Sequence, residues 1–146
     1  MQNYPKYEVW NNKQIKEFHK ELKKQFGFEG KLDYVFLSNK DKIYIVSKDF
    51  EKLSLRNINN AGLYIAKHDL GCLRLSIEGS QLIGPKCTKN ILDLQDPADW
   101  MQGKEIATEK IFKNAVIIKF QNDFLGSGIY KNKRILNFIP KSRRIR

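Results

Sequence analysis

The chain has 146 residues, with 27 lysines and arginines against 16 aspartates and glutamates, and its formal net charge is +11. Its apolar fraction of 41% and its nine phenylalanines, six tyrosines and two tryptophans exclude a disordered polar chain. No apolar run approaches the roughly 18 residues of a membrane helix, and the first ten residues lack the core of a signal peptide, so we expect a soluble, cytoplasmic protein. The charge favours a polyanionic partner, either nucleic acid or an acidic membrane surface.

The positive charge is concentrated toward the carboxyl end. Residues 1–79 contain 14 basic and 10 acidic side chains, whereas residues 80–146 contain 13 basic and 6 acidic ones. No acid follows Asp123, and seven cations lie in the last 16 residues. Solubility alone explains a moderate excess of charge, but an acid-free run indicates a surface that binds phosphates. We therefore favour nucleic acid as the partner and expect the tail to form one cationic surface.

The first periodic segment predicts an amphipathic helix that begins near residue 12. Its apolar residues recur at spacings of three and four along one stripe: Ile15, Phe18, Leu22 and Phe26. Asn11 or Asn12 is expected to cap the helix, and Gly27 to end it. Another face is rich in lysine: Lys13, Lys16, Lys20, Lys23 and Lys24. These lysines either contact phosphate or form a solvated face paired with Glu17 and Glu21, and we favour the solvated face.

A small sheet is expected next. Residues 34–38 and 42–47 are rich in aromatic and β-branched side chains and are joined across Asn39-Lys40-Asp41, a pattern that predicts a hairpin. A short helix is expected around Asp49–Leu53. The run AGLYIAKHD (residues 61–69) predicts a further strand, which Leu70-Gly71 turns into CLRLSIEG (residues 72–79). The first half is therefore predicted to combine one main helix with a small sheet.

The second half alternates short strands with turns. Strands are predicted over residues 73–77, 90–94, 115–121, 124–130 and 134–139, with turns at 78–80, 84–85, 121–123 and 131–133. A short helix is predicted over Pro97–Gln102, with Asp96 as its cap and Gly103 as its end. This pattern is typical of a small, partly closed mixed barrel. We place a boundary near Gly71–Leu73, which divides the chain into domains of residues 1–71 and 72–146.

Metal and redox sites are not expected. The two cysteines, Cys72 and Cys87, have no CxxC spacing, and the two histidines, His19 and His68, add too few ligands for the roughly four of a structural zinc site. We expect reduced, partly buried thiols and no metal.

Catalytic and cofactor motifs are also missing from the sequence. Gly126-Ser127-Gly128 lies between residues of strand character, so we interpret it as a bulge or a close backbone approach rather than a phosphate loop. His68 before Asp69 indicates a local turn more than a catalytic pair. We therefore expect no cofactor, and a protein that is not an enzyme.

Two segments combine cations, glycines and amides in a way that suits a ribose-phosphate chain: residues 79–90 and residues 130–146. Small residues let a nucleic-acid backbone approach closely, and amides donate to phosphate or 2′-hydroxyl oxygens. Tyr130 and Phe138 either stack on an unpaired base or belong to the core of the last hairpin, and we favour the core.

Four runs of the sequence resemble a PUA domain: LRLSIEGSQLIGP (residues 73–85), TKNILDL (88–94), DWMQGKEI (99–106) and FLGSGIYKNKRILNFIPKSRRIR (124–146). The resemblance is to the version fused or related to Nol/Nop/Sun (Fmu) 5-methylcytosine rRNA methyltransferases, which in archaea also occurs as a short stand-alone protein. KIYIVSKD (residues 42–49) and the leading helix are similar to the pre-PUA domain of those short proteins.

The resemblance implies an α+β fold, with a small α/β pre-PUA domain packed on a C-terminal PUA β-pseudobarrel with short helices. It also implies binding of structured rRNA or tRNA in ribosome biogenesis or RNA modification. The methyltransferases carry a separate catalytic domain, for which this chain has no room. With the charge pattern, the resemblance suggests these RNA-binding residues: Gly79, Gly84, Lys86, Lys89, Asn90, Lys131, Arg134, Lys141, Arg143, Arg144 and Arg146.

A second hypothesis makes the protein an adaptor that binds other proteins. The first half is nearly balanced in charge and rich in aromatic residues. Such a protein would be the detached targeting subunit of an rRNA or tRNA methyltransferase, or a component of a pre-ribosomal particle. Retention of a protein partner after RNA digestion would distinguish this hypothesis from direct RNA binding.

Overall fold

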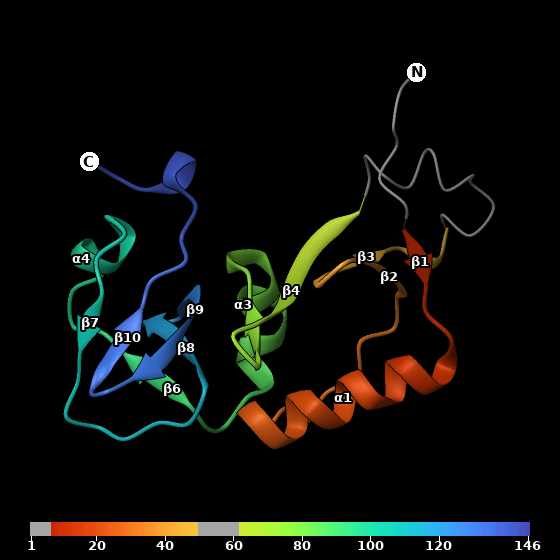
Figure 1. Ribbon diagram of the computed structural model, residues 1–146, viewed down its shortest axis with the longest axis horizontal. Helices are drawn as coiled ribbons and strands as arrows, with labels where there is room; N and C mark the ends of the chain where they lie inside the picture. The colour runs from red at the N-terminus through yellow and green to blue at the C-terminus, as the bar shows by residue number, and fades with distance from the viewer. Residues whose placement is uncertain (1–6, 50–61) are drawn as a thin grey trace.

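Two five-stranded sheets lie at opposite ends of the molecule, with helix α3 between them (Figure 1). The computed structural model describes residues 7–49 and 62–146. The first sheet has the strand order β1 (Glu8–Val9), β2 (Val35–Asn39), β3 (Lys42–Val46), β4 (Leu63–Asp69) and β5 (Cys72–Leu75). The second has the order β6 (Ile91–Asp93), β8 (Ala115–Phe120), β9 (Asp123–Lys131), β10 (Arg134–Leu136) and β7 (Ile106–Ala107). This mixed architecture confirms the predicted α+β class.

Helix α1 (Asn12–Phe26) lies along one side of the first sheet and has the predicted ends (Figure 1). Asn11 is its cap: the Asn11 side chain accepts a hydrogen bond from the Gln14 amide, and the Gln14 side chain accepts one from the Asn11 amide, each 2.9 Å long. Gly27 ends the helix with φ at 65°, a left-handed conformation that glycine adopts without strain. Three residues of the predicted apolar stripe, Phe18, Leu22 and Phe26, are buried.

His19 is a structural residue of this helix. Its Nδ1–H donates to the Ile15 carbonyl at 2.8 Å, and its Nε2 accepts from the Leu32 amide at 2.9 Å. Both ring nitrogens are thus occupied by the backbone, so His19 fixes the segment after α1 against the helix.

The predicted hairpin is confirmed as β2 and β3, and the predicted strand over residues 61–69 as β4. The antiparallel β4–β5 pair places Lys67 opposite Arg74 and His68 opposite Leu73. The short helix expected around Asp49–Leu53 falls, after Asp49, outside the described residues.

The strand predicted over residues 73–77 is confirmed as β5 only as far as Leu75, and the turn predicted at 78–80 is wrong. Strand β5 ends at Leu75, and Ile77–Ile83 form helix α3. Ser76 is the cap, because its Oγ accepts from the Gly79 amide at 2.9 Å and donates to the Tyr64 carbonyl at 2.7 Å. In addition, β5 pairs with β4 of the first sheet and belongs to no strand ladder of the second.

The second sheet follows the prediction more closely. Strands β6, β8 and β9 lie within one or two residues of the predicted ranges, whereas β10 is shorter than expected and the two-residue β7 has no counterpart in the prediction. Helix α4 (Ala98–Met101) confirms the predicted short helix, and Asp96 Oδ1 accepts from the Ala98 amide at 2.9 Å. Two 3-10 helices complete the half, η2 (Gly84–Lys86) and η3 (Lys141–Arg143).

Polar contacts join the two sheets through β9. Ser127 Oγ accepts from the Leu75 amide at 2.7 Å and donates to the Leu75 carbonyl at 3.1 Å, while the Gly126 amide donates to Ser80 Oγ at 2.8 Å. Ser80 and Ser127 are the two buried polar residues of the described chain. The predicted close backbone approach is confirmed at Gly128, where a Cβ would lie 2.2 Å from the Leu136 carbonyl oxygen.

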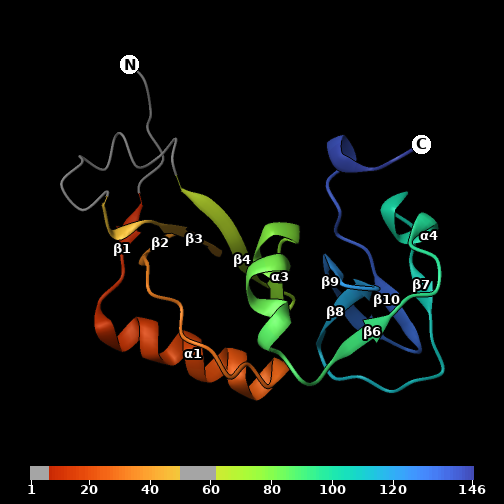
Figure 2. The same ribbon diagram turned by 180° about the vertical axis from the view of Figure 1, so that it is seen from behind.

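The link from α3 to the second sheet passes beside the end of α1 (Figure 2). The Thr88 and Lys89 amides both donate to the Phe26 carbonyl, at 2.9 and 3.1 Å. The predicted boundary between residues 71 and 72 falls in the turn of the β4–β5 hairpin. The division into residues 1–71 and 72–146 stays a prediction.

Candidate nucleic-acid interface

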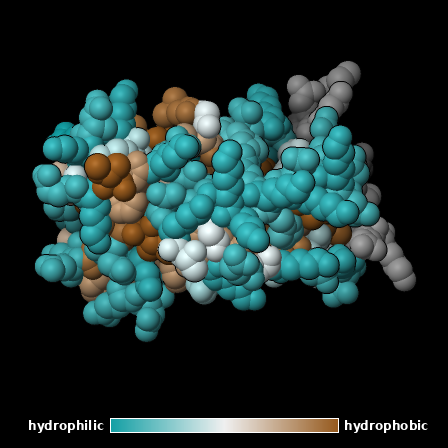
Figure 3. Space-filling view, turned by 90° about the horizontal axis from the view of Figure 1, so that it is seen from below, coloured by the Kyte–Doolittle hydropathy of each residue, from teal (hydrophilic) through white to brown (hydrophobic). Residues whose placement is uncertain are grey.

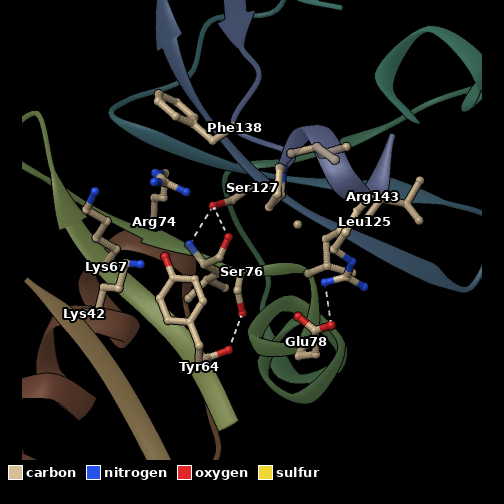
Figure 4. A pocket seen from close by; sticks show the side chains of 15 residues that line it. Lys42, Tyr64, Lys67, Arg74, Ser76, Glu78, Leu125, Ser127, Phe138 and Arg143 are labelled. Carbon is tan, nitrogen blue, oxygen red and sulfur yellow. Dashed lines mark hydrogen bonds and ion pairs between the residues drawn. The ribbon is translucent and has the colours of Figure 1, made fainter. Parts of the chain in front are cut away.

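A hollow of about 220 Å³ lies between the first sheet and the elements that follow β8 (Figure 4). We call it the inter-sheet cleft. Strands β3, β4 and β5 and the start of α3 line one side, and β9, the segment after β10 and η3 line the other. The lining residues are Lys42, Tyr64, Lys67, Arg74, Leu75, Ser76, Ile77, Glu78, Leu125, Gly126, Ser127, Phe138, Ile139, Pro140 and Arg143.

Cations outnumber carboxylates around the inter-sheet cleft. Four lining residues are cationic: Lys42, Lys67, Arg74 and Arg143. Asp69 pairs with the Arg74 guanidinium at 3.1 Å and with the Lys67 ammonium at 3.9 Å. Glu78 pairs with Arg143 at 2.5 Å. Four cations thus face two carboxylates, which leaves a local excess of two positive charges for an anionic ligand.

Aromatic rings lie among these cations. The Arg74 guanidinium lies over the Phe138 ring, 4.2 Å from its centroid, and the Lys42 ammonium lies 5.4 Å from the centroid of Tyr64. Burial raises the pKa of the Tyr64 phenol, so this group stays protonated and able to donate at neutral pH. The cleft therefore combines flat rings with positive charge, the two features that hold a single nucleotide strand.

The floor of the cleft is preformed. The two hydrogen bonds between Ser127 and Leu75 cross from β9 to β5 at its base, and the bond from Ser76 to the Tyr64 carbonyl fixes the start of α3 (Figure 4). Because buried polar groups that are fully paired resist rearrangement, the rings and cations are presented from a rigid base.

A second hollow, of about 470 Å³, lies at the C-terminal end of α1, and we call it the basic groove. Its walls come from α1, the β4–β5 turn, the residues before β6 and the residues before β8. The lining residues are Glu21, Lys24, Gln25, Gly71, Cys72, Leu73, Lys89, Asn90, Lys113 and Asn114. Seen from the side on which α1 lies, the surface of the molecule is mostly hydrophilic (Figure 3).

The predicted RNA-binding residues do not meet at one place. Lys89 and Asn90 line the basic groove, and Arg143 lines the inter-sheet cleft. Lys86 lies beside Gly30, on the exposed surface. Lys141 and Arg146 are exposed in the tail.

Gly79 and Gly84 were predicted to let an RNA backbone approach closely, but their surroundings leave no room for one. Both are buried, and protein atoms already fill the approach: a Cβ on Gly79 would lie 1.9 Å from the Ile65 carbonyl oxygen, and one on Gly84 would lie 2.3 Å from the Phe124 ring. Both glycines serve internal packing.

Acidic residues from other segments lie next to the acid-free tail. Arg134 lies opposite Lys131 in the β9–β10 hairpin, and its Nη1 lies 3.5 Å from Glu105 Oε1. Arg143 forms an ion pair with Glu78. Arg144 donates from Nε to the Ile139 carbonyl at 3.0 Å and lies against Gly103. The expected single cationic surface is therefore divided.

The two aromatic residues of the last hairpin have different surroundings. Tyr130 packs against the core of the second sheet, with its ring centroid 6.1 Å from that of Phe112. This placement agrees with the interpretation of Tyr130 as a core residue. Phe138 is partly buried and supports Arg74 in the cleft.

Four cleft residues were missed from the sequence: Lys42, Tyr64, Lys67 and Arg74. The sequence did contain a signal for Lys67 and Arg74, because the tight Leu70-Gly71 turn sets the β4–β5 register that places these two residues opposite each other. No local pattern indicated that this pair would face Phe138, which lies more than 60 residues further along the chain.

The thiols agree with expectation. Cys72 and Cys87 are both free, and burial raises the pKa of Cys72 and that of Cys87, the latter to about 12. Among residues 7–49 and 62–146, no three His, Cys, Asp or Glu side chains gather in a way that could hold a metal ion. The same residues include no helix long and apolar enough to cross a membrane.

Comparison with known proteins identifies the second half. Residues 88–145, which run from the start of the second sheet to the tail, match the family described as the methyltransferase RsmF PUA domain. No curated protein matches the chain significantly. The matched strands β6 to β10 form one sheet with short helices, an arrangement consistent with a PUA domain. Residues 88–145 therefore form a PUA domain that is related to the PUA domains of Sun/Fmu-type methyltransferases.

Proposed function

We propose that this protein binds structured RNA, either rRNA or tRNA, through the inter-sheet cleft. The PUA domain is an RNA-binding domain of rRNA methyltransferases, which gives the ligand class. The observation that carries the proposal is the meeting of cations and rings from both sheets in one hollow: Lys67 and Arg74 from the first sheet, and Phe138 and Arg143 from the second half.

Each side chain has a role that follows from its position. Lys42 and Lys67 lie on neighbouring strands and neutralise phosphates as point charges. Arg74 and Phe138 already stack on each other, so they form a platform for an unpaired base next to Tyr64. Arg143 is released from Glu78 when a phosphate competes for its guanidinium.

Titration of a stem-loop RNA with an unpaired loop, followed by fluorescence anisotropy at several salt concentrations, tests the proposal. The double variant Lys42→Ser, Lys67→Ser is expected to weaken binding by about tenfold and to flatten the slope of log K against log salt by about one per lysine. Neither lysine is buried, so the fold is retained.

The matched control removes the same charge elsewhere. Lys31 and Lys110 are exposed and line neither hollow, so Lys31→Ser, Lys110→Ser is expected to change the affinity only slightly. Equal weakening by both double variants would show that net charge alone attracts the RNA and would contradict a site in the cleft.

We further propose that the bound RNA takes part in ribosome biogenesis or is a substrate of RNA modification in the cytoplasm. We also propose that the chain has no catalytic activity of its own. Crosslinking in cells followed by sequencing of the bound RNA identifies the target. Enrichment of mRNA over rRNA and tRNA would contradict this assignment.

The adaptor hypothesis has one supporting observation, the exposure of Val9 and Leu63 on the first sheet. A methyltransferase or a pre-ribosomal protein that stays bound after RNase treatment supports it. Loss of that partner in a Val9→Ser, Leu63→Ser variant would place the contact on this sheet.

A further inference from the structure

We infer that the basic groove is a second phosphate-binding site, which takes the sugar-phosphate backbone of the same RNA on the other face of the first sheet. This inference rests on the proposed function and extends it from one contact surface to two.

The basic groove brings together three lysines from separate segments. Lys24 lies in the last turn of α1, Lys89 precedes β6, and Lys113 precedes β8. None of the three takes part in an ion pair within the described parts of the chain. Three like charges around one hollow repel each other, and an anion between them relieves the repulsion.

The one carboxylate that lines the groove is already engaged. Glu21 Oε1 lies 2.7 Å from His68 Nε2, and its Oε2 lies 3.2 Å from the same atom. Three lysines thus line the groove against this one carboxylate, so the groove keeps a net positive charge.

Hydrogen bonds hold the walls of the groove in place. The Gln25 side-chain amide donates to the carbonyls of Lys113 and Ala115, at 2.6 and 2.7 Å. The Asn90 side chain donates to the Gln25 carbonyl at 2.6 Å and accepts from the Lys113 amide at 3.3 Å. These bonds tie the segments that carry Lys24, Lys89 and Lys113 to one another.

The same bonds decide what the groove can recognise. Because Gln25 Nε2 and both polar atoms of the Asn90 side chain are hydrogen-bonded to the backbone, these atoms are not free to read base edges. The lysines are point charges without the planar fork of arginine, so they bind phosphates with little regard to sequence. A hollow of about 470 Å³ is larger than one phosphate group, which fits a run of phosphodiesters.

The two hollows lie on opposite faces of the β4–β5 hairpin. Lys67 and Arg74 are cross-strand partners that line the inter-sheet cleft, whereas His68 and Leu73, the next pair, face α1 and the basic groove. A single straight strand cannot occupy both faces. An RNA that bends around the hairpin, or that offers two neighbouring segments, can occupy both, so we expect a preference for structured RNA.

The test uses the triple variant Lys24→Gln, Lys89→Gln, Lys113→Gln, in which all three altered side chains are exposed. We expect RNA affinity to fall at least tenfold, and the salt slope to decrease by about three, one for each lysine that no longer neutralises a phosphate. The matched control is Lys13→Gln, Lys16→Gln, Lys31→Gln, which removes the same charge from exposed positions outside the groove. Equal behaviour of the two triple variants would overturn the inference.

A second arm distinguishes an RNA backbone from a small anion. Inorganic pyrophosphate is titrated while the amide resonances of Lys89, Asn90 and Asn114 are followed by NMR. We expect binding at least a hundredfold weaker than that of the RNA, because pyrophosphate fills only part of the groove. Pyrophosphate affinity equal to that of RNA would assign the groove to a small anion and overturn the inferred occupant.

Combination with the cleft variant separates this inference from the proposed function. Because the two sites lie on opposite faces and share no side chain, the reductions in affinity from Lys42→Ser, Lys67→Ser and from the groove variant are expected to multiply. Weaker binding in the cleft variant alone leaves the proposed function intact and refutes the second site. Weaker binding in the groove variant alone refutes the cleft as the RNA site.

Discussion

At the scale of single residues, the pairing of His68 with Glu21 joins the first sheet to α1. Hydrogen bonding to the Glu21 carboxylate raises the pKa of His68, and the charge of Asp41 acts in the same direction, while partial burial opposes both. The protonated imidazole is therefore stabilised in the folded protein. Because the two side chains are 49% and 41% exposed, solvent screens the pair, and its contribution stays below about 1 kcal/mol.

This pair predicts a pH dependence of stability with a definite sign. A histidine whose pKa is raised by folding stabilises the folded state fully below its ordinary value near 6.5, and this contribution is lost as the pH rises through the raised value. We expect the free energy of unfolding in urea to decrease by up to about 1 kcal/mol between about pH 6 and pH 8.5. In His68→Gln this decrease should disappear. A wild-type stability that rises over the same range would contradict the assignment.

At the scale of elements, α3 depends on a glycine for its position against β4. Gly79 lies so close to Ile65 that a Cβ would come within 1.9 Å of the backbone carbonyl oxygen. Ser80, on the same helix, holds the Gly126 amide of β9. The helix therefore contacts both sheets, and its distance from β4 is set by the absence of a side chain at position 79.

Gly79→Ala is expected to destabilise the protein, although alanine is the better helix former by about 1 kcal/mol. The methyl group forces α3 away from backbone atoms that cannot yield, a displacement that costs about 1–3 kcal/mol or more. Urea unfolding monitored by circular dichroism measures the net change. Gln81→Ala, at an exposed position of the same helix, is the control and should change stability by less than about 0.5 kcal/mol. A stabilised Gly79→Ala variant would show that the helix shifts freely.

Most elements were predictable because their signals are local. The cap of α1 at Asn11, its end at Gly27, and the hairpins around residues 40 and 132 follow from turn and cap chemistry. The prediction for the segment after β5 was wrong because Leu73, Leu75 and Ile77 alternate as in a strand, and this pattern concealed the helix cap at Ser76. Strand β7 has only two residues, too few to show a periodicity.

The candidate site was less predictable than the fold. The charge pattern and the family resemblance together indicated Lys89 and Arg143, which line the two hollows, but the resemblance also indicated Gly79 and Gly84, which are buried. Whether a cation is free or paired depends on contacts between distant segments, such as Arg143 with Glu78. The sequence does not reveal these contacts without the packing of the two sheets.

At the scale of the whole molecule, one hydrophobic core extends into both sheets. Phe18 and Phe36 from the first half belong to the same buried cluster as Ile117 and Phe124 from the second. The end of α1 and the link before β6 are also joined by hydrogen bonds to the Phe26 carbonyl. Neither sheet can separate from the other without exposing part of this core.

We therefore expect the two halves to unfold together. Trp10 packs on Phe36 in the first half, and Trp100 is fully buried in the second, so Trp100→Phe and Trp10→Phe each leave one reporter. In each variant, tryptophan fluorescence and far-ultraviolet circular dichroism should give the same urea midpoint. A fluorescence midpoint that differs from the circular dichroism midpoint in either variant would show that the halves unfold separately.

The bonds between β9 and β5 also limit how this protein can be used in chimeras. A fragment cut at residue 88, where the family match starts, would lack Leu75 and Ser80. Water would then replace these partners of the Ser127 hydroxyl and the Gly126 amide on the newly opened surface, and β9 would lose the bonds that fix it against β5 and α3. A graft onto an enzyme should therefore carry β5 and α3 along with the matched segment.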